Sequence, residues 1–200
     1  MFYDAIKNDH GLRYDPFKAI VAPRPIGWIT AMNAKGEINL APYSFFNGIS
    51  SRPALVMFSS EGLKDSVSFI AETGEFVCNL ATWDLREAMN ATAAPLPRGV
   101  NEMERAGLKP APSRLVKPPR VAASPCALEC KLIRIVPIDS AGGLPVDCHV
   151  VIGQVVGVHI DDRFIVDGLL DTAAMKPIAR CGYDQYAVVE SVFSMTRPTS

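Results

Sequence analysis

The chain has 200 residues, 48% of them hydrophobic and 8% aromatic, which suits one globular domain with a sizeable core. Its net charge of −1 comes from interspersed acidic and basic residues without a basic stripe, which argues against nucleic-acid binding. The apolar runs are too short to span a membrane, and no charged segment followed by an apolar run opens the chain. We therefore expect neither a membrane segment nor a secretory signal.

The five cysteines, at positions 78, 126, 130, 148 and 181, are an odd number and lie mostly in or beside apolar runs. This usage predicts small buried thiols in a reducing cytosol, so we expect a cytoplasmic protein. Cys126 and Cys130 lie in a strand-like run with no histidine pair at zinc-finger spacing, and we expect no metal site. His10 and His159 look like isolated surface or edge residues.

Residues 1–16 read as a polar arm that ends in an Asp-Pro turn. The next segment predicts a hairpin of Ile26–Met32 with Ile38–Ala41, because a loop ending in Gly36 joins two apolar runs. Ala54–Ser59 is expected to be a third strand.

Two helices and a strand are predicted in the middle of the chain. Leu63–Thr73 has the apolar spacing of a helix and is followed by Gly74 as a stop signal. Glu75–Leu80 reads as a strand and Asp84–Ala93 as a second helix.

Residues 95–125 contain seven of the sixteen prolines, which forbids a continuous helix or a central strand. The segment could be a linker between two domains. We favour an ordered excursion of a single domain covering residues 1–200, because it carries the apolar anchors Met103, Leu108, Leu115 and Val116.

Two long β-branched runs, Ala127–Ile138 and Val146–Ile160, follow and are separated by a Gly-Gly turn. Both faces of Val146–Ile160 are largely apolar, whereas a strand with one wet face would alternate. One face is expected in a barrel interior and the other against a partner. This pattern predicts a closed dimer.

Polar and aromatic side chains gather where the predicted strands end. Pro42–Asn47 places aromatic rings beside a hydroxyl and an amide, and further hydroxyls recur at Thr30, Ser50 and Ser59. So many hydroxyl and amide groups are not expected in an apolar core, where each would need a hydrogen-bond partner. The pattern favours a pocket for a flat ligand with polar edges.

Three segments carry a family resemblance, in this order: PRPIGWIT with NLAPYSFF, then Lys64–Thr82, then Pro177–Pro198. From about Tyr14 onward the chain resembles the flavin reductase-like family of FMN-binding split barrels. The resemblance implies a mainly β fold with helices, of the split β-barrel type. It also implies a homodimer with the flavin near the subunit boundary, and a lid or wall formed by residues 95–125. The chain departs from the family pattern at three positions, where Ser66 replaces a Thr, Tyr183 a Gly and Cys181 an aliphatic residue.

Lys64, Asp65 and Ser66 open the first predicted helix and are candidates for binding the FMN phosphate. Helix N-termini present unpaired N–H groups and favour anions, and Lys64 and Ser66 add a cation and a hydroxyl. Read alone, the tripeptide favours an N-cap at Asp65 or Ser66 beside a solvated Lys64. The resemblance favours the phosphate.

The flavin ring has candidates in Thr30, Ser44 and Phe45, and Ser59 is a further candidate for binding the cofactor. Trp28 shares the face of Thr30, and it either walls the flavin or fills the barrel. The remaining candidates are cationic. Arg24, fixed between two prolines, suits an anionic ligand or a surface salt bridge, and Arg180 suits the flavin phosphate or the pocket rim.

By resemblance, the chain is an NAD(P)H-dependent flavin reductase with FMN as cofactor and NADH or NADPH as donor. Electrons would pass to a second flavin, a partner monooxygenase or another acceptor. No side-chain acid or base is needed for hydride transfer, so no catalytic residue is assigned. No Rossmann or P-loop motif is present, so a nicotinamide would stack on the flavin. One alternative is an FMN-binding electron carrier of the flavoredoxin type that is not an enzyme. Another is a related split barrel with pyridoxal phosphate or a different cofactor.

Overall fold

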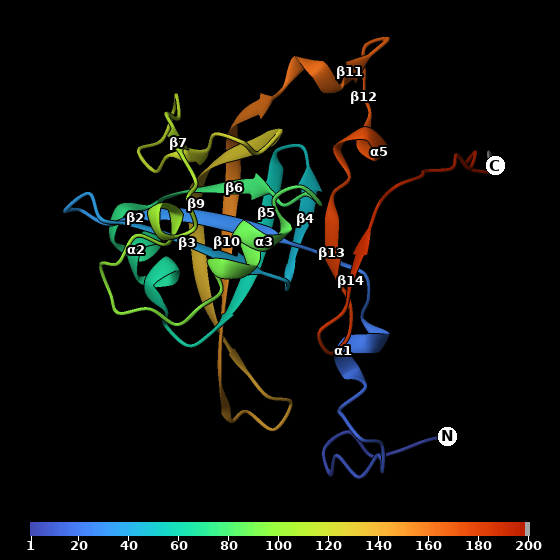
Figure 1. Cartoon of the computed structure of the whole chain (residues 1–200). Helices are drawn as coiled ribbons and strands as arrows, with labels where there is room; N and C mark the ends of the chain where they lie inside the picture. The colour runs from blue at the N-terminus through green and yellow to red at the C-terminus, as the bar shows by residue number, and fades with distance from the viewer. Residues whose placement is uncertain (199–200) are drawn as a thin grey trace.

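The computed structural model describes residues 1–198, and its centre is one curled antiparallel sheet (Figure 1). The sheet has seven strands in the order β3-β2-β6-β9-β10-β5-β4. These strands are β2 (Gly27–Met32), β3 (Ile38–Tyr43), β4 (Phe46–Ser51), β5 (Ala54–Glu61), β6 (Glu75–Leu80), β9 (Cys126–Asp139) and β10 (Pro145–Ile160). The edge strands β3 and β4 are consecutive in the chain and meet at Ser44 and Phe45. The sheet therefore curls into a barrel, and Ser59 N donates to Phe45 O at 2.9 Å at this corner.

Three short helices, α2 (Asp65–Thr73), α3 (Arg86–Ala91) and α4 (Glu102–Arg105), cover one flank of the barrel, while the others and the small ribbons lie around it. The other helices are α1 (Phe17–Ile20), α5 (Thr172–Met175) and a 3₁₀ turn at Asp162–Phe164. The ribbons are β1 (Arg24–Pro25) with β13 (Ile178–Arg180) and β14 (Tyr186–Val188), β7 (Pro110–Ala111) with β8 (Arg120–Val121), and β11 (Ile165–Val166) with β12 (Leu169–Leu170). Figure 1 shows α1 and the β13–β14 ribbon together beside the barrel, and β1 pairs with β13, so an N-terminal and a C-terminal segment lie side by side there.

The barrel interior is filled by large side chains from facing strands. Phe58 of β5 and Phe76 of β6 are fully buried, with ring centroids 5.9 Å apart. Gly153 of β10 makes room for this packing, because a Cβ there would lie 2.3 Å from the Phe76 ring. The glycine is thus a close-approach position inside an otherwise β-branched strand.

A second core layer lies outside β2 and β3, beneath α3 and α4. Trp28 and Leu40 pack there with Met89, Met103 and Val121. The indole N–H of Trp28 donates to Thr92 Oγ1 at 2.9 Å. The alternation of β2 therefore supplies two cores, one on each face of the strand.

The predicted strands and the first predicted helix are confirmed within a few residues. The second predicted helix is shorter than expected, spanning only Arg86–Ala91. The sequence analysis missed β4, which has a mostly exposed, hydroxyl-rich sequence and little apolar alternation. The prediction of a mainly β fold with helices is correct.

Residues 95–125 form an ordered excursion with α4 and the β7–β8 ribbon. Met103 and Val116 are buried, as expected of anchors, but Leu115 is 56% exposed, so its assignment as an anchor was wrong. Hydrogen bonds hold this part of the segment in place of an apolar anchor. The backbone N–H groups of Arg114 and Leu115 donate to the buried carboxylate of Glu129.

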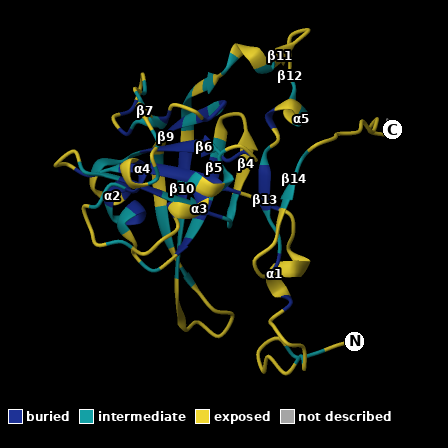
Figure 2. Cartoon of the chain, in the orientation of Figure 1, coloured by how far each residue is buried: buried dark blue, intermediate teal, exposed yellow. Residues whose placement is uncertain are grey.

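Exposed apolar side chains concentrate outside the barrel, where Figure 2 shows the N-terminal arm, the β11–β12 ribbon and the C-terminal tail as largely exposed. Along β10, Val151 is buried whereas Val158 and Ile160 are exposed in the isolated chain. Within residues 1–198, no helix is long and apolar enough to cross a membrane.

Candidate functional site

Two adjoining hollows lie at the corner where β3 turns into β4. The first, which we call the helix hollow, has a volume of about 520 Å³ and lies beside the start of α2. It is lined by six of the ten predicted site residues: Ser44, Phe45, Ser59, Lys64, Asp65 and Ser66. Residues separated by up to 22 positions in the chain are thus brought together, because the strand ends of β3 and β5 converge on the first turn of α2.

The start of α2 is open to a ligand. Lys64 occupies the N-cap position in an extended conformation, and no side chain caps the helix. The alternative in which Asp65 or Ser66 serves as the N-cap is therefore wrong. Asp65 instead accepts a hydrogen bond from Arg98 Nε at 2.7 Å, which offsets its charge at this helix end. The first N–H groups of a helix lack intrahelical partners and carry positive partial charge, so this end suits an anion.

A buried hydrogen-bond relay lies at the base of the helix hollow. The Ser66 hydroxyl donates to Asn39 Oδ1, and Asn39 Nδ2 donates to Glu102 Oε1 at 3.0 Å. The other carboxylate oxygen, Glu102 Oε2, accepts from Leu40 N at 3.0 Å. Ser66 and Glu102 both line the hollow. The relay therefore connects the excursion, β3 and α2 at one point beneath the candidate ligand.

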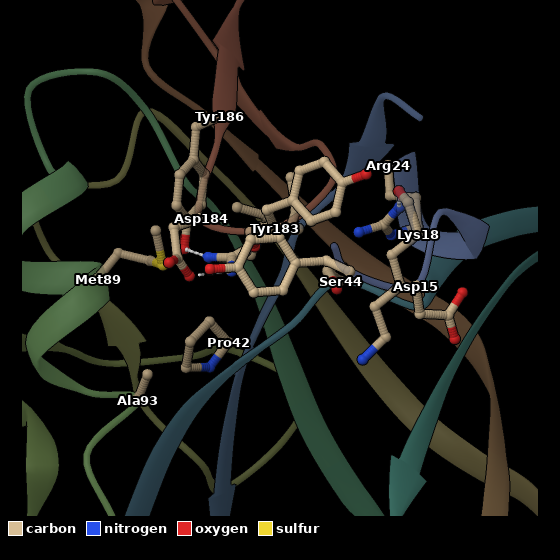
Figure 3. Close-up of a pocket in the computed structure, with 13 residues that line it drawn as sticks. Asp15, Lys18, Arg24, Pro42, Ser44, Met89, Ala93, Tyr183, Asp184 and Tyr186 are labelled. Carbon is tan, nitrogen blue, oxygen red and sulfur yellow. Dashed lines mark hydrogen bonds and ion pairs between the residues drawn. The ribbon is translucent and has the colours of Figure 1, made fainter. Parts of the chain in front are cut away.

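The second hollow, which we call the tyrosine hollow, has a volume of about 590 Å³ and is lined in part by Tyr14, Tyr183 and Tyr186. It shares Lys18, Pro42, Ser44 and Ala93 with the helix hollow. Figure 3 shows Asp15, Lys18 and Arg24 on one side of it and Met89 and Ala93 on the other. A ligand in one hollow would therefore lie next to a ligand in the other.

Arg24 and Arg180 both line the tyrosine hollow, and neither lines the helix hollow. The guanidinium of Arg24 donates to the carbonyl oxygens of Val21, of Lys18 at 2.5 Å and of Cys181 at 2.8 Å. Its alternative role in a surface salt bridge is wrong, because Arg24 is only 6% exposed and bonds carbonyl groups. Arg180 donates to Tyr186 Oη at 2.6 Å and forms an ion pair with Asp184 at 3.3 Å, which places it at the rim.

Trp28 and Thr30 lie away from both hollows. Both are fully buried, and Thr30 Oγ1 accepts from Asn79 Nδ2 at 2.9 Å. Of the two readings of Trp28, core filling is correct, because the ring packs in the layer under α3. Their assignment to the flavin ring is corrected because β2 is an inner strand, covered on both faces.

Sequence reasoning missed Lys18, Tyr43 and Glu102 as lining residues, and Asn39 also lines the helix hollow. Burial raises the pKa of Tyr43, so its phenol stays neutral and can donate to a ligand. Glu102 follows the helix-capping Asn101 in the proline-rich segment. The asparagine at position 101, a good N-cap residue, was the sequence signal that could have revealed α4 in this segment.

A second buried carboxylate lies outside both hollows. Glu129 is fully buried and bonds His159 Nε2 at 2.5 Å, so the view of His159 as an isolated residue is corrected. Burial by itself would raise the pKa of Glu129, but hydrogen bonds from His159 and from backbone N–H groups lower it overall. All five cysteines are free thiols, and among residues 1–198 no cluster of potential ligands suits a metal ion.

Relatives of the chain match almost its whole length. An uncharacterized protein of Halalkalibacterium halodurans is 37% identical over 184 residues, covering 90% of this chain and 88% of the relative. The uncharacterized protein YwrF of Bacillus subtilis is 34% identical, with 93% of each protein covered.

Solved structures show the same fold. Nitrilotriacetate monooxygenase component B of Bacillus cereus superposes with a TM-score of 0.89 at 29% identity, covering 98% of each chain. The 2-nitrobenzoate 2-nitroreductase of Pseudomonas fluorescens gives a TM-score of 0.85 at 27% identity, covering 100% of this chain and 97% of its own. Residues 21–173 match the family model of the flavin reductase like domain. The match spans most of the sequence and agrees with the barrel, so the chain belongs to the flavin reductase-like family of split-barrel proteins.

Proposed function

We propose that the protein binds FMN in the helix hollow and acts as an NAD(P)H-dependent flavin oxidoreductase. The observation that carries this proposal is the uncapped start of α2, with Lys64 at its end, opening into a hollow lined by strand-end hydroxyls. A terminal phosphate needs such a cation and free N–H groups. A flat, polar-edged ring needs the neighbouring mixture of apolar wall and hydrogen-bonding groups.

In this arrangement the phosphate lies at Lys64 and at the backbone N–H of Ser66, whose hydroxyl already donates to Asn39, and the ring lies toward Ser44, Phe45 and Ser59. The carboxylates lining the hollow are partly engaged already, since Glu102 accepts two hydrogen bonds and Asp65 pairs with Arg98. When bound, FMN supplies the hydride-accepting chemistry of the protein. The residues of the chain hold the cofactor, shape its surroundings and keep one side open toward the tyrosine hollow.

The electron donor and acceptor belong to the same proposal. The adjoining tyrosine hollow gives a second ligand access beside the flavin, as NADH or NADPH would need. The likeness to a monooxygenase component B favours a partner oxygenase or a free flavin as acceptor. A second candidate is an electron carrier of the flavoredoxin type, favoured by the fold it shares with the flavoredoxin of Desulfovibrio vulgaris.

A homodimer in the cytoplasm completes the proposal. Val158 is 59% exposed on β10, and the apolar side chains of the terminal arms are also exposed in the isolated chain. A closed two-fold dimer is the commonest way to bury such surfaces. We expect Val158→Asp to give monomers by light scattering. The excursion, whose residues Pro95, Leu96 and Glu102 line the helix hollow, would form the wall or lid over the cofactor.

The decisive experiment titrates the protein with FMN and with riboflavin, which lacks the phosphate. Lys64→Ala should weaken FMN binding by about 1.5–3 kcal/mol, the scale of a hydrogen bond to a charged group, and riboflavin binding far less. Lys35→Ala, in the exposed hairpin loop, is the matched control and should change neither affinity. Equal losses for both ligands would remove Lys64 from the phosphate site.

NAD(P)H oxidation then separates the two candidate functions. A flavin reductase oxidises NADH or NADPH continuously when excess FMN is present, because the free flavin accepts the electrons. An electron carrier binds FMN but needs another reductase to reduce it. If the protein shows no flavin absorbance after incubation with FMN and removal of the unbound flavin, both candidate functions are contradicted.

A further inference from the structure

Tyr183 has a backbone conformation that is costly for its side chain. It lies in the left-handed region at φ 56°, where bulky residues are uncommon and glycine is at ease. The turn that holds it is fixed, because Gln185 N donates to Gly182 O at 3.0 Å and Gly182 is pressed against Ala19. A Cβ on Gly182 would lie 2.4 Å from Ala19 Cβ. Strained backbone positions cluster at functional sites, so we infer that the aromatic ring of Tyr183 has a functional role.

The Tyr183 ring forms part of an aromatic wall in the tyrosine hollow. It packs against Tyr14 with ring centroids 5.6 Å apart, and both line the hollow together with Tyr186. Arg180 lies over the Tyr186 ring at 4.6 Å and donates to the Tyr183 carbonyl oxygen. The wall is thus held from behind by side chains of the same segment, while Tyr183 and Tyr186 remain 45% and 40% exposed.

The charge of the tyrosine hollow favours an anion. Its lining includes three cations, Lys18, Arg24 and Arg180, against two carboxylates. Within residues 1–198, one of these cations, Arg180, forms an ion pair, with Asp184. Arg24 is only 6% exposed, and its guanidinium donates to neutral carbonyl groups. Its Nε has no hydrogen-bond partner among the described residues. Asp15 is the carboxylate on this side of the hollow, and it accepts a hydrogen bond from Phe17 N. Two cations against one carboxylate leave a net positive charge on this side.

We propose that the tyrosine hollow binds a planar aromatic anion, and that Tyr183 selects this class of second ligand by stacking on it. The ring would lie against the tyrosines, with the anionic group toward Lys18 and Arg24 (Figure 3). The proposal rests on the proposed function for the cofactor in the neighbouring hollow. The chemistry of the tyrosine hollow alone sets the ligand class.

The test uses the full chain, with and without FMN, and benzoate as the probe in calorimetric titrations. Benzoate should bind the wild-type protein, and Tyr183→Gly should weaken it about 3- to 10-fold, the range expected for loss of an aromatic stacking partner. Tyr183→Phe retains the ring and should bind benzoate like the wild type. Tyr183→Gly should melt no lower than the wild type, because glycine is at ease at this φ, so weaker binding cannot be ascribed to unfolding.

Two further probes separate shape from charge. Cyclohexanecarboxylate, which has the charge without the planar ring, and benzamide, which has the ring without the charge, should both bind more weakly than benzoate. Benzoate affinity unchanged in Tyr183→Gly, or a cyclohexanecarboxylate or benzamide affinity equal to that of benzoate, would overturn the proposal. A ring-dependent benzoate site in a protein that does not bind FMN would refute the proposed function but leave this inference standing.

Discussion

Replacing Glu102 by alanine should loosen the base of the helix hollow. The side chain is 8% exposed, and its two oxygens accept from the Asn39 amide and the Leu40 backbone N–H, both at 3.0 Å. Alanine leaves both donors without their acceptors. It also removes the polar tie between α4 in the excursion and β3.

The magnitude follows from those two donors. A buried donor left unpaired costs about 1–3 kcal/mol, so two give about 2–6 kcal/mol. We expect the lower part of that range, about 2–3 kcal/mol, because Glu102 lines the hollow and water can reach the freed groups. Glu102→Gln should cost less, since the Asn39 amide can reverse and accept from the new side-chain amide while its own NH₂ group donates to Ser66.

The assay is urea unfolding followed by circular dichroism, repeated at saturating FMN. Glu102→Ala should lower the free energy of unfolding in both conditions and gain less stabilisation from FMN than the wild type, because a ligand stabilises only the folded state that binds it. A Glu102→Ala variant within about 0.5 kcal/mol of the wild type, the usual range for surface changes, would refute the relay. Equal losses for the alanine and glutamine variants would refute the amide reversal.

Three further outcomes are expected. The pKa of Glu129 is lower in the folded protein than its unfolded value of about 4.3, so its stabilisation is present above that value and lost as pH falls through the folded pKa. Urea midpoints of Glu129→Gln should therefore fall less on acidification than those of the wild type, and parallel curves would contradict this. Gly153→Ala should destabilise by about 1–3 kcal/mol, because its Cβ would overlap the Phe76 ring, and a calorimetric Tm equal to that of the wild type would argue against this packing. Trp28→Phe should cost about 1 kcal/mol for the lost indole hydrogen bond, more if a cavity remains, and leave FMN affinity unchanged, so a large loss of affinity would return Trp28 to the flavin site.

The sequence alone determined the local elements and the chemistry available at their ends. Alternation and glycine stops predicted β2, β3, β5 and α2, because strand and helix periodicity depend on near neighbours in the chain. A lysine followed by short polar residues marked the start of α2 as either an anion site or a capped helix end, and the folded chain shows that no side chain caps it. The family resemblance then fixed the mainly β fold.

The tertiary structure decided which of these side chains share a space. Trp28 alternates in phase with Thr30, and only the layer under α3 shows that both are enclosed. Glu102 reaches Asn39 across 63 positions, and Arg24 reaches Cys181 across 157. Such contacts are set by how the sheet curls and where the excursion returns, and no local pattern encodes them. Tyr183 shows both contributions: the family resemblance marks it as a departure from Gly, whereas its positive φ and its place in the tyrosine hollow are properties of the folded chain.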